Sequence, residues 1–150
     1  MTSIPRFAAY AAAFEKAYES NDWSIVEPFF TEDAVYEIKG SGPPLGAISR
    51  GRAAILAYFD RILNGFDRRF ATRELILREG PRERDGAVWI KGGVRYTAPG
   101  VPDLEFDLEE SVWFEGDRIR RLEDSYDAAN AAALLRWVEA HGAKVGLAIE

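Results

Sequence analysis

Apolar side chains recur at steps of three and four residues in several stretches of the chain, a spacing that places them on one face of a helix. In the first stretch these residues are Phe7, Tyr10, Phe14 and Tyr18. Asp22 is well placed to cap a second, shorter helix. The predicted helices span residues 3–20, 23–30, 52–63 and 128–140.

Elsewhere apolar residues alternate with polar ones, and β-branched and aromatic side chains are frequent, which predicts strands. The predicted strands span residues 34–38, 70–78, 87–97, 104–114 and 118–126, and a turn is expected over residues 80–86. Short connections join the last three strands, so we expect antiparallel pairing. Helices followed by a strand meander predict an α+β fold, with the N-terminal helices packed on the concave face of a curved, mostly antiparallel sheet. Such a sheet forms a cone with an internal pocket.

No repeat, low-complexity tract or linker interrupts this pattern, which predicts one domain over residues 1–150. With 47% hydrophobic residues the chain has enough apolar material for a core. No apolar run approaches the roughly 20 residues that a membrane span needs, and the N-terminus lacks the apolar segment of a signal peptide. We therefore expect a cytoplasmic protein without a membrane partner.

Charge and residue usage exclude several classes of function. The chain has 25 acidic and 19 basic residues, and its net charge of −6 disfavours binding to nucleic acid or to anionic membranes. It has no cysteine and a single histidine, His141, which removes thiolate catalysis, cysteine-based zinc sites and paired histidines. We expect no metal and no other cofactor.

Two carboxylates interrupt apolar stripes in the predicted strands. Glu110 lies two positions after Leu108 on an apolar strand face, and Asp124 lies between Leu122 and Tyr126 on a face of the next strand. A buried carboxylate is costly and tends to be neutral or paired, and two acids that share a pocket have their pKa values pushed apart. The alternatives are a bulge that turns Glu110 outward and a purely structural hydrogen bond for Asp124.

The strand over residues 87–97 has one apolar face and one face with Trp89, Lys91 and Arg95. Arg95 would either supply a counter-charge to Asp124 in the pocket or form a salt bridge on the outer face of the sheet. A register slip of one residue would exchange the two faces, so both interpretations stay open.

Four short stretches, in their order and spacing, resemble the nuclear-transport-factor-2-like superfamily and, within it, the SnoaL-like group. They are residues 21–26 (Asn-Asp-Trp-Ser-Ile-Val), 30–36 (Phe-Thr-Glu-Asp-Ala-Val-Tyr), 51–55 (Gly-Arg-Ala-Ala-Ile), and 114–119 (Phe-Glu-Gly-Asp-Arg-Ile) leading to 123–127 (Glu-Asp-Ser-Tyr-Asp). The superfamily also contains ketosteroid isomerases, limonene epoxide hydrolases and scytalone dehydratase. The resemblance implies the cone fold over about residues 7 to 130 but little about the reaction, because this fold hosts unrelated chemistries.

The resemblance also implies roles for single residues. Asp124 matches the catalytic aspartate of SnoaL-like cyclases and limonene epoxide hydrolases, and Glu110 matches a histidine that assists this aspartate in the cyclases. Tyr36 matches a substrate-orienting tyrosine of the epoxide hydrolases. The Arg-x-Asp pair of those enzymes falls on Lys91 and Gly93, so its bridging acid is missing.

Other positions depart from the catalytic sets of the superfamily. Ile38 stands near the general base of ketosteroid isomerases and at an asparagine of epoxide hydrolases, while Phe14 stands at the isomerases' oxyanion tyrosine. Tyr18-Glu19 replaces the Tyr-Asp pair of scytalone dehydratase, whose two histidines are absent. These departures argue against ketosteroid isomerase and scytalone dehydratase chemistry.

The sequence thus predicts a cofactor-independent enzyme that uses acid–base catalysis on a small hydrophobic molecule, by aldol-type cyclisation, isomerisation or dehydration, or epoxide opening. Asp124 would be the principal acid or base, Glu110 its partner, Tyr36 a hydrogen-bond donor to the substrate, and Arg95 a counter-charge. The residues expected to bind the substrate are Phe14, Tyr18, Ile38, Phe59, Phe106, Leu108, Tyr126 and Lys91. The alternative is a non-catalytic protein that binds a small molecule in the same pocket.

The outer face of the sheet is the expected surface for a homodimer. Trp113 lies on the strand face opposite Phe106 and Leu108, where an exposed aromatic residue would suit an interface. Relatives in the superfamily commonly dimerise, and the resemblance implies the same here.

Overall fold

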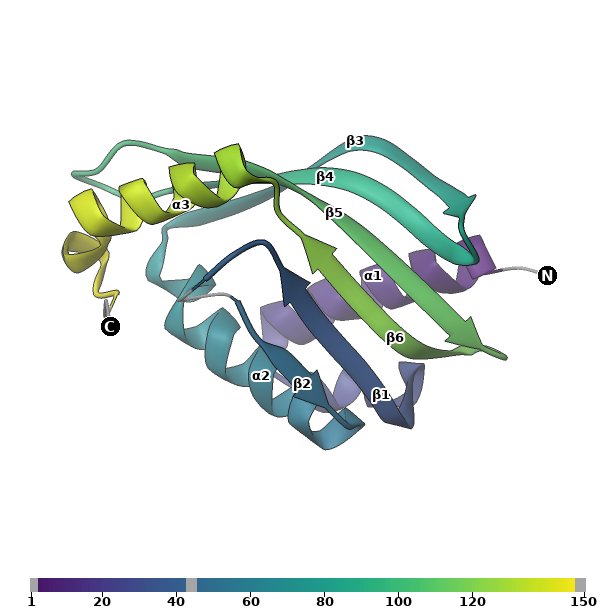
Figure 1. The fold of residues 1–150 in the computed structure, drawn as a ribbon. Coiled ribbons are helices and arrows are strands. Elements are labelled where there is room, and N and C mark those ends of the chain that lie inside the picture. The colour runs from purple at the N-terminus through teal and green to yellow at the C-terminus, as the bar shows by residue number, and fades with distance from the viewer. Residues whose placement is uncertain (1–2, 43–45, 148–150) are drawn as a thin grey trace.

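One curved sheet of six strands forms the frame of the computed structural model, which describes residues 3–42 and 46–147 (Figure 1). The strands are β1 (Phe30–Lys39), β2 (Ile48–Arg50), β3 (Thr72–Arg84), β4 (Ala87–Thr97), β5 (Leu104–Glu115) and β6 (Arg118–Ser125). The α-helices are α1 (Ser3–Ser20), α2 (Arg52–Gly65) and α3 (Ala128–His141). Four short 3₁₀ turns are η1 (Trp23–Ile25), η2 (Glu27–Phe29), η3 (Asp67–Arg69) and η4 (Gly142–Val145).

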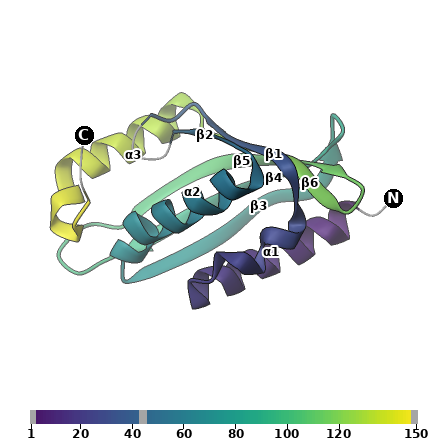
Figure 2. The same cartoon turned by 90° about the horizontal axis from the view of Figure 1, so that it is seen from below.

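The strand order is β2-β1-β6-β5-β4-β3. Four of the five neighbouring pairs are antiparallel, and β1 runs parallel to β6. The sheet curls without closing, and α1 and α2 both lie against its concave side (Figure 2). Helix α3 lies across the end of the sheet, against β5 (Figure 1). The predicted α+β class, with a curved and mostly antiparallel sheet, is therefore confirmed.

The amphipathic faces of α1 and α2 explain why these helices cover the sheet. The buried side chains of α2 include Tyr58 and Phe59, which belong to its apolar face. Helix α1 buries Phe7 and Tyr10. Phe14 of α1 meets Phe59 of α2 edge to face, with 5.2 Å between ring centroids. Such an aromatic pair adds roughly 0.5–1.5 kcal/mol beyond the burial of its area. The apolar residues that recur at helical intervals in the sequence are thus the residues through which the two helices pack.

Buried side chains gather in two clusters. One lies under α1 and α2 and includes Phe30, Val112 and Leu122. The other joins the wide end of the sheet to α3 and includes Tyr96 and Leu134. Since residues of both clusters line the same cavity, the two clusters form the wall of one pocket.

Three local features differ from the predicted pattern. The second predicted helix is two 3₁₀ turns, because Pro28 at the start of η2 cannot donate the backbone hydrogen bond that a continuous helix needs. Strand β3 continues to Arg84, into the predicted turn at residues 80–86, and the register irregularity between Glu79 and Arg82 absorbs Gly80 and Pro81. The chain then reverses at Asp85–Gly86, both with positive φ as a tight hairpin turn requires. Strand β2 was not predicted, because three residues are too few to show alternation.

The outer face of the sheet carries a series of ion pairs. Arg121 contacts Glu37 and Glu123, with both nitrogen–oxygen distances at 2.6 Å, and its cross-strand neighbour on β5 is Trp113. Homodimerisation through this face stays a prediction. None of the helices in the described ranges is long and apolar enough to cross a membrane.

Candidate functional site

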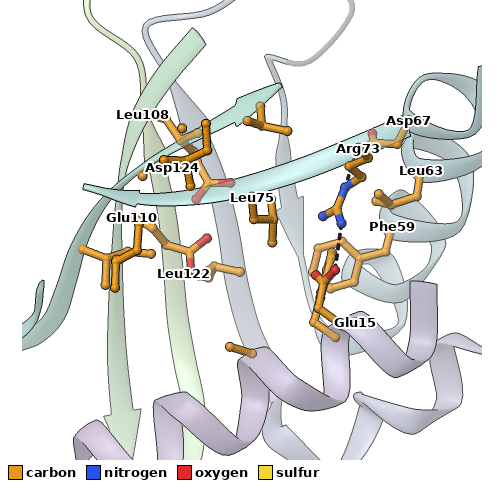
Figure 3. Close-up of a pocket in the computed structure, with 18 of the residues that line it drawn as sticks. Glu15, Phe59, Leu63, Asp67, Arg73, Leu75, Leu108, Glu110, Leu122 and Asp124 are labelled. Atoms are coloured by element: carbon orange, nitrogen blue, oxygen red, sulfur yellow. Dashed lines mark hydrogen bonds and ion pairs between the residues drawn. The ribbon is translucent and has the colours of Figure 1, made fainter. Parts of the chain in front are cut away.

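A cavity of about 530 Å³ lies between the concave face of the sheet and helices α1 and α2. Its size is in the range of ligand-binding pockets in general. Side chains from α1, α2, β1, β3, β4, β5 and β6 line it, and most of them are aliphatic or aromatic. The charged side chains that line it form two groups, one at each side of the cavity (Figure 3).

The first group is the pair of Asp124 on β6 and Glu110 on β5. The two residues face each other directly across the β5–β6 ladder, and both line the cavity. Asp124 is only 8% exposed. The irregularity in this ladder lies between Trp113 and Phe114, so no bulge turns Glu110 outward. Figure 3 shows both carboxyl groups pointing into the pocket.

Tyr36 on β1 completes this group. Its hydroxyl donates a hydrogen bond to Oδ2 of Asp124 at 2.5 Å. The other oxygen, Oδ1, is buried and has no N–H or alcohol O–H donor among the described residues. When the Glu110 carboxyl is protonated, it donates a hydrogen bond to Asp124. Asp124 is thus held between a phenol and a second carboxyl group.

Burial and proximity separate the acid–base properties of the two carboxyl groups. Burial raises the pKa of Glu110 well above its usual range, and the neighbouring Asp124 raises it further. Burial also raises the pKa of Asp124, but the hydrogen bonds from Glu110 and Tyr36 lower it. Two close carboxyl groups hold one proton between them most readily. The pKa of Glu110 is raised further than that of Asp124, so Glu110 is the more readily protonated of the two. Burial, reinforced by the charge of Asp124, raises the pKa of Tyr36, so its hydroxyl stays a donor.

This arrangement makes the stability of the protein depend on pH through Glu110. Because folding raises the pKa of Glu110, its contribution to stability is complete below the usual glutamate range and is lost as pH rises through the folded value. Glu110→Gln removes this ionisation and keeps an N–H donor for Asp124. Relative to the wild type, the variant should gain about 1–2 kcal/mol of unfolding free energy at about pH 8, and less at about pH 5.

Chemical denaturation at both pH values measures this difference. The matched control is Glu109→Gln, one residue away on the same strand, where the carboxylate accepts a hydrogen bond from Trp89. An equal effect of Glu110→Gln at the two pH values would contradict a proton held by Glu110 in the folded state.

The second polar group surrounds Arg73 on β3. The Nε atom of Arg73 donates to Oδ2 of Asp67 in η3, and its Nη1 atom donates to Oε1 of Glu15 in α1, both at 2.9 Å. Tyr96 on β4, the cross-strand neighbour of Arg73, donates its hydroxyl to Oδ2 of Asp67 at 2.8 Å. The side chains of Arg73 and Asp67 are each 9% exposed. Burial raises the pKa of Asp67, and Arg73 and Tyr96 oppose this effect.

Figure 3 places the Asp67–Arg73–Glu15 group on the side of the cavity opposite Asp124 and Glu110. Sequence reasoning missed it. Arg73 is two positions before Leu75 and lines the cavity, so a charge on an inward strand face was the available signal. Asp67 lies in a short turn without periodicity, and no pattern in the sequence indicated its direction.

The structure brings most of the predicted binding residues to the cavity, where Tyr36, Glu110 and Asp124 also lie. These predicted residues are Phe14, Ile38, Phe59, Phe106, Leu108 and Tyr126. Tyr18 is not among the residues that line the cavity, because its ring lies under the guanidinium groups of Arg68 and Arg73, 4.4 and 4.6 Å from the ring centroid.

Arg95 and Lys91 do not line the cavity either, and the prediction of a counter-charge from them is corrected. Arg95 forms an ion pair with Asp103 at 2.8 Å and its side chain is 47% exposed, which is the outer-face salt bridge that the sequence also allowed. Both residues alternate with Ile90 and Val94, which point inward, so the geometry of β4 turns them outward.

No group of three or more His, Cys, Asp or Glu side chains in residues 3–42 and 46–147 is arranged to hold a metal ion. The chemistry that this site can provide is proton transfer and hydrogen bonding by the carboxyl pair, Tyr36 and the Arg73 group.

Several solved structures share this fold. Bal32a, from a soil-derived mobile gene cassette, is 19% identical over 86% of this chain and 95% of its own, with a TM-score of 0.64. TerC, co-crystallised with polyporic acid, is 18% identical over 89% of this chain and 98% of its own, with a TM-score of 0.66. An LEH-like epoxide hydrolase of M. tuberculosis is 18% identical over 91% of this chain and 94% of its own, with a TM-score of 0.60.

At such identities these structures establish the fold alone. No curated protein matches the chain in sequence. The sequence of residues 10–122, however, matches the SnoaL-like domain. This match spans most of the chain and includes most of the residues that line the cavity, and it ends two residues before Asp124. The chain therefore belongs to the SnoaL-like domain family.

Proposed function

We propose that this protein is a cofactor-independent enzyme that performs acid–base catalysis on a small hydrophobic substrate. The observation that carries the proposal is the Asp124–Glu110 pair, which faces an apolar cavity and in which the pKa of Glu110 is raised further than that of Asp124. Pairs of titratable groups whose environments separate their pKa values are typical of catalytic sites.

In the proposed reaction Asp124 is the base and Glu110 is the acid. Asp124 removes a proton from a carbon next to a carbonyl group, or from a water molecule, while Glu110 gives its proton to the substrate oxygen on which negative charge develops. Tyr36 orients Asp124 through the hydrogen bond to Oδ2, and Oδ1 has no other hydrogen-bond donor among the described residues. Asp124 is buried, which strengthens these electrostatic interactions.

A base at Asp124 and an acid at Glu110 suit an aldol-type cyclisation, an isomerisation or dehydration, and an epoxide opening. Each needs one proton removed and one proton delivered at a nearby oxygen. Two structural neighbours give these reactions a context, since one is an LEH-like epoxide hydrolase and another was crystallised with polyporic acid. The order of loss and gain of protons would differ among these reactions, but the two carboxyl groups keep their roles.

The second candidate function is non-catalytic binding of a small molecule in the same cavity. It is favoured by Ile38, the neighbour of Asp124 on β1, which lines the cavity and cannot transfer a proton. The catalytic sets of the resembling enzymes are therefore incomplete here. A binding protein needs only the shape and the apolar lining of the pocket.

A panel of epoxides and polyketide-like ketones separates these two functions when binding and turnover are measured on the same compounds. We expect the wild-type protein to convert at least one compound that it binds, and this turnover to require an ionisable carboxyl group at position 124. Compounds that bind tightly and remain unchanged throughout the panel would favour the binding function instead.

A further inference from the structure

The Arg73 group is a second polar position in the same cavity, and the proposed acid–base step does not use it. The group contains N–H donors that its own hydrogen bonds do not use. An arginine carries five N–H donors, and Arg73 uses one on Nε for Asp67 and one on Nη1 for Glu15. In the part of the chain that the structure describes, the hydrogen bonds of Arg73 come from Nε and Nη1, which leaves Nη2 for a ligand in the cavity that Arg73 lines.

The position of Arg73 is fixed by its neighbours. Asp67 and Glu15 hold the guanidinium from two sides, and the ring of Tyr18 lies 4.6 Å from its central carbon. A donor held in this way loses little conformational freedom when a ligand arrives, so its hydrogen bond contributes more to affinity and orientation.

The charges around Arg73 select the kind of acceptor. Two carboxylates already surround one guanidinium, and Asp67 is nearly as buried as Arg73 itself. An incoming carboxylate or phosphate would place a third negative group beside a single positive one, which is unfavourable in a poorly solvated site. An uncharged oxygen, such as a carbonyl or an ether, accepts the free N–H groups without this repulsion.

We infer that the substrate has an apolar body and a second, uncharged oxygen acceptor, which Arg73 binds at the end of the cavity away from Asp124 and Glu110. The apolar middle of the cavity, with Leu75 and Leu122 between the two polar groups in Figure 3, accommodates the body. The reacting oxygen lies at the Glu110 end. The inference rests on the proposed function in one respect only, namely that the reaction takes place at the Glu110 end of the cavity and not at the Arg73 end.

Matched ketones test this inference without any need for turnover. The probes are linear methyl ketones of roughly eight to twelve carbons, which suit the cavity, and the diketones that carry a second carbonyl group near the other end. Their flexible chains adjust to the span between the two groups. Displacement of the fluorescent apolar dye 1-aminoanthracene gives the dissociation constant of each probe.

In the wild-type protein the best diketone should bind roughly tenfold tighter than its monoketone, the gain typical of one hydrogen bond to a charged donor. The test variant is the double substitution Arg73→Met and Asp67→Asn, which removes both members of the buried ion pair and leaves Tyr96 an acceptor. In this variant the diketone and monoketone should bind within about twofold of each other. The matched control is Arg95→Met with Asp103→Asn, an ion pair on the neighbouring strand outside the cavity, which should keep the tenfold ratio.

Arg73→Lys is a second variant that keeps a positive charge beside Asp67 while losing the planar fork, and it should reduce the ratio as well. A wild-type ratio near one, or a ratio that persists in the double variant, would overturn the inference. So would tighter binding of the corresponding keto acid than of the diketone, because that result would identify an anion site.

The two proposals fail separately. A wild-type protein that turns over its substrate but binds the diketone no tighter than the monoketone would remove the Arg73 subsite and leave acid–base catalysis standing. Ketone binding that depends on Arg73 in a protein without turnover would keep the subsite and favour the binding function.

Discussion

Asp124→Asn is expected to lower turnover by about 10²- to 10⁴-fold, because an amide cannot accept the proton that the reaction must lose. Binding should change far less. Asparagine has nearly the same shape as aspartate, and its carbonyl oxygen still accepts the hydrogen bond from Tyr36. Burial, the main cause of the raised pKa of Glu110, remains in the variant, but the added effect of the Asp124 charge is lost, so the pKa of Glu110 should fall toward its usual range. The measurements are turnover under saturating substrate and the dissociation constant of the same compound.

Asp107→Asn is the matched control for this substitution. Asp107 lies on β5 and contacts Arg78, and it does not line the cavity. This variant should keep turnover within about twofold of the wild type, as is usual for a residue outside the reacting groups. If Asp124→Asn kept full turnover on a confirmed substrate, Asp124 would lose its role as the base.

The largest expected effect on stability comes from Arg73. Arg73→Met removes the cation that compensates Asp67, and both side chains are only 9% exposed. A carboxylate left unpaired in such a place is costly, and we expect the free energy of unfolding to fall by about 3–5 kcal/mol. Chemical denaturation at neutral pH measures this loss. Lower pH should reduce it, since protonation of Asp67 removes the unpaired charge.

The double variant with Asp67→Asn separates the charge from the packing. Neutral side chains at both positions remove the uncompensated ion. Most of the lost stability should therefore return in the double variant, although the ion pair is still absent. Comparable losses in the single and double variants would show that Arg73 acts through its packing against Tyr18 and not through Asp67.

The strand periodicity in the sequence carried enough information to predict much of the acidic side of the cavity. Glu110 and Asp124 each stand on an apolar strand face, and a two-residue period fixes which face points inward once the ladder is regular. The structure has that regular ladder at Glu110 and Asp124. The direct contact between Asp124 and Tyr36 was not predictable, because it depends on a parallel pairing of β1 with β6, two strands far apart in the chain.

The Arg73 side of the cavity was hidden for a different reason. Its members come from a helix, a short turn and two strands, and only the assembled fold brings Glu15, Asp67 and Arg73 together. Arg95 shows the converse. The sequence allowed it to reach the predicted site as a counter-charge, but the alternation of β4 turns it outward toward Asp103.

Strand β3 forms a free edge of the open sheet, and the two halves of this edge differ in how readily another strand could add to it. The half before Gly80 begins with regular pairing and exposes Leu75 and Leu77, which are 54% and 61% accessible. In the other half Pro81 lacks a backbone donor, the register shifts, and charged side chains follow up to Arg84. Irregular pairing and charge discourage strand addition, whereas a regular apolar edge permits it. Self-association at high concentration should therefore begin at the first half of this edge, and a lysine at position 77 should suppress it.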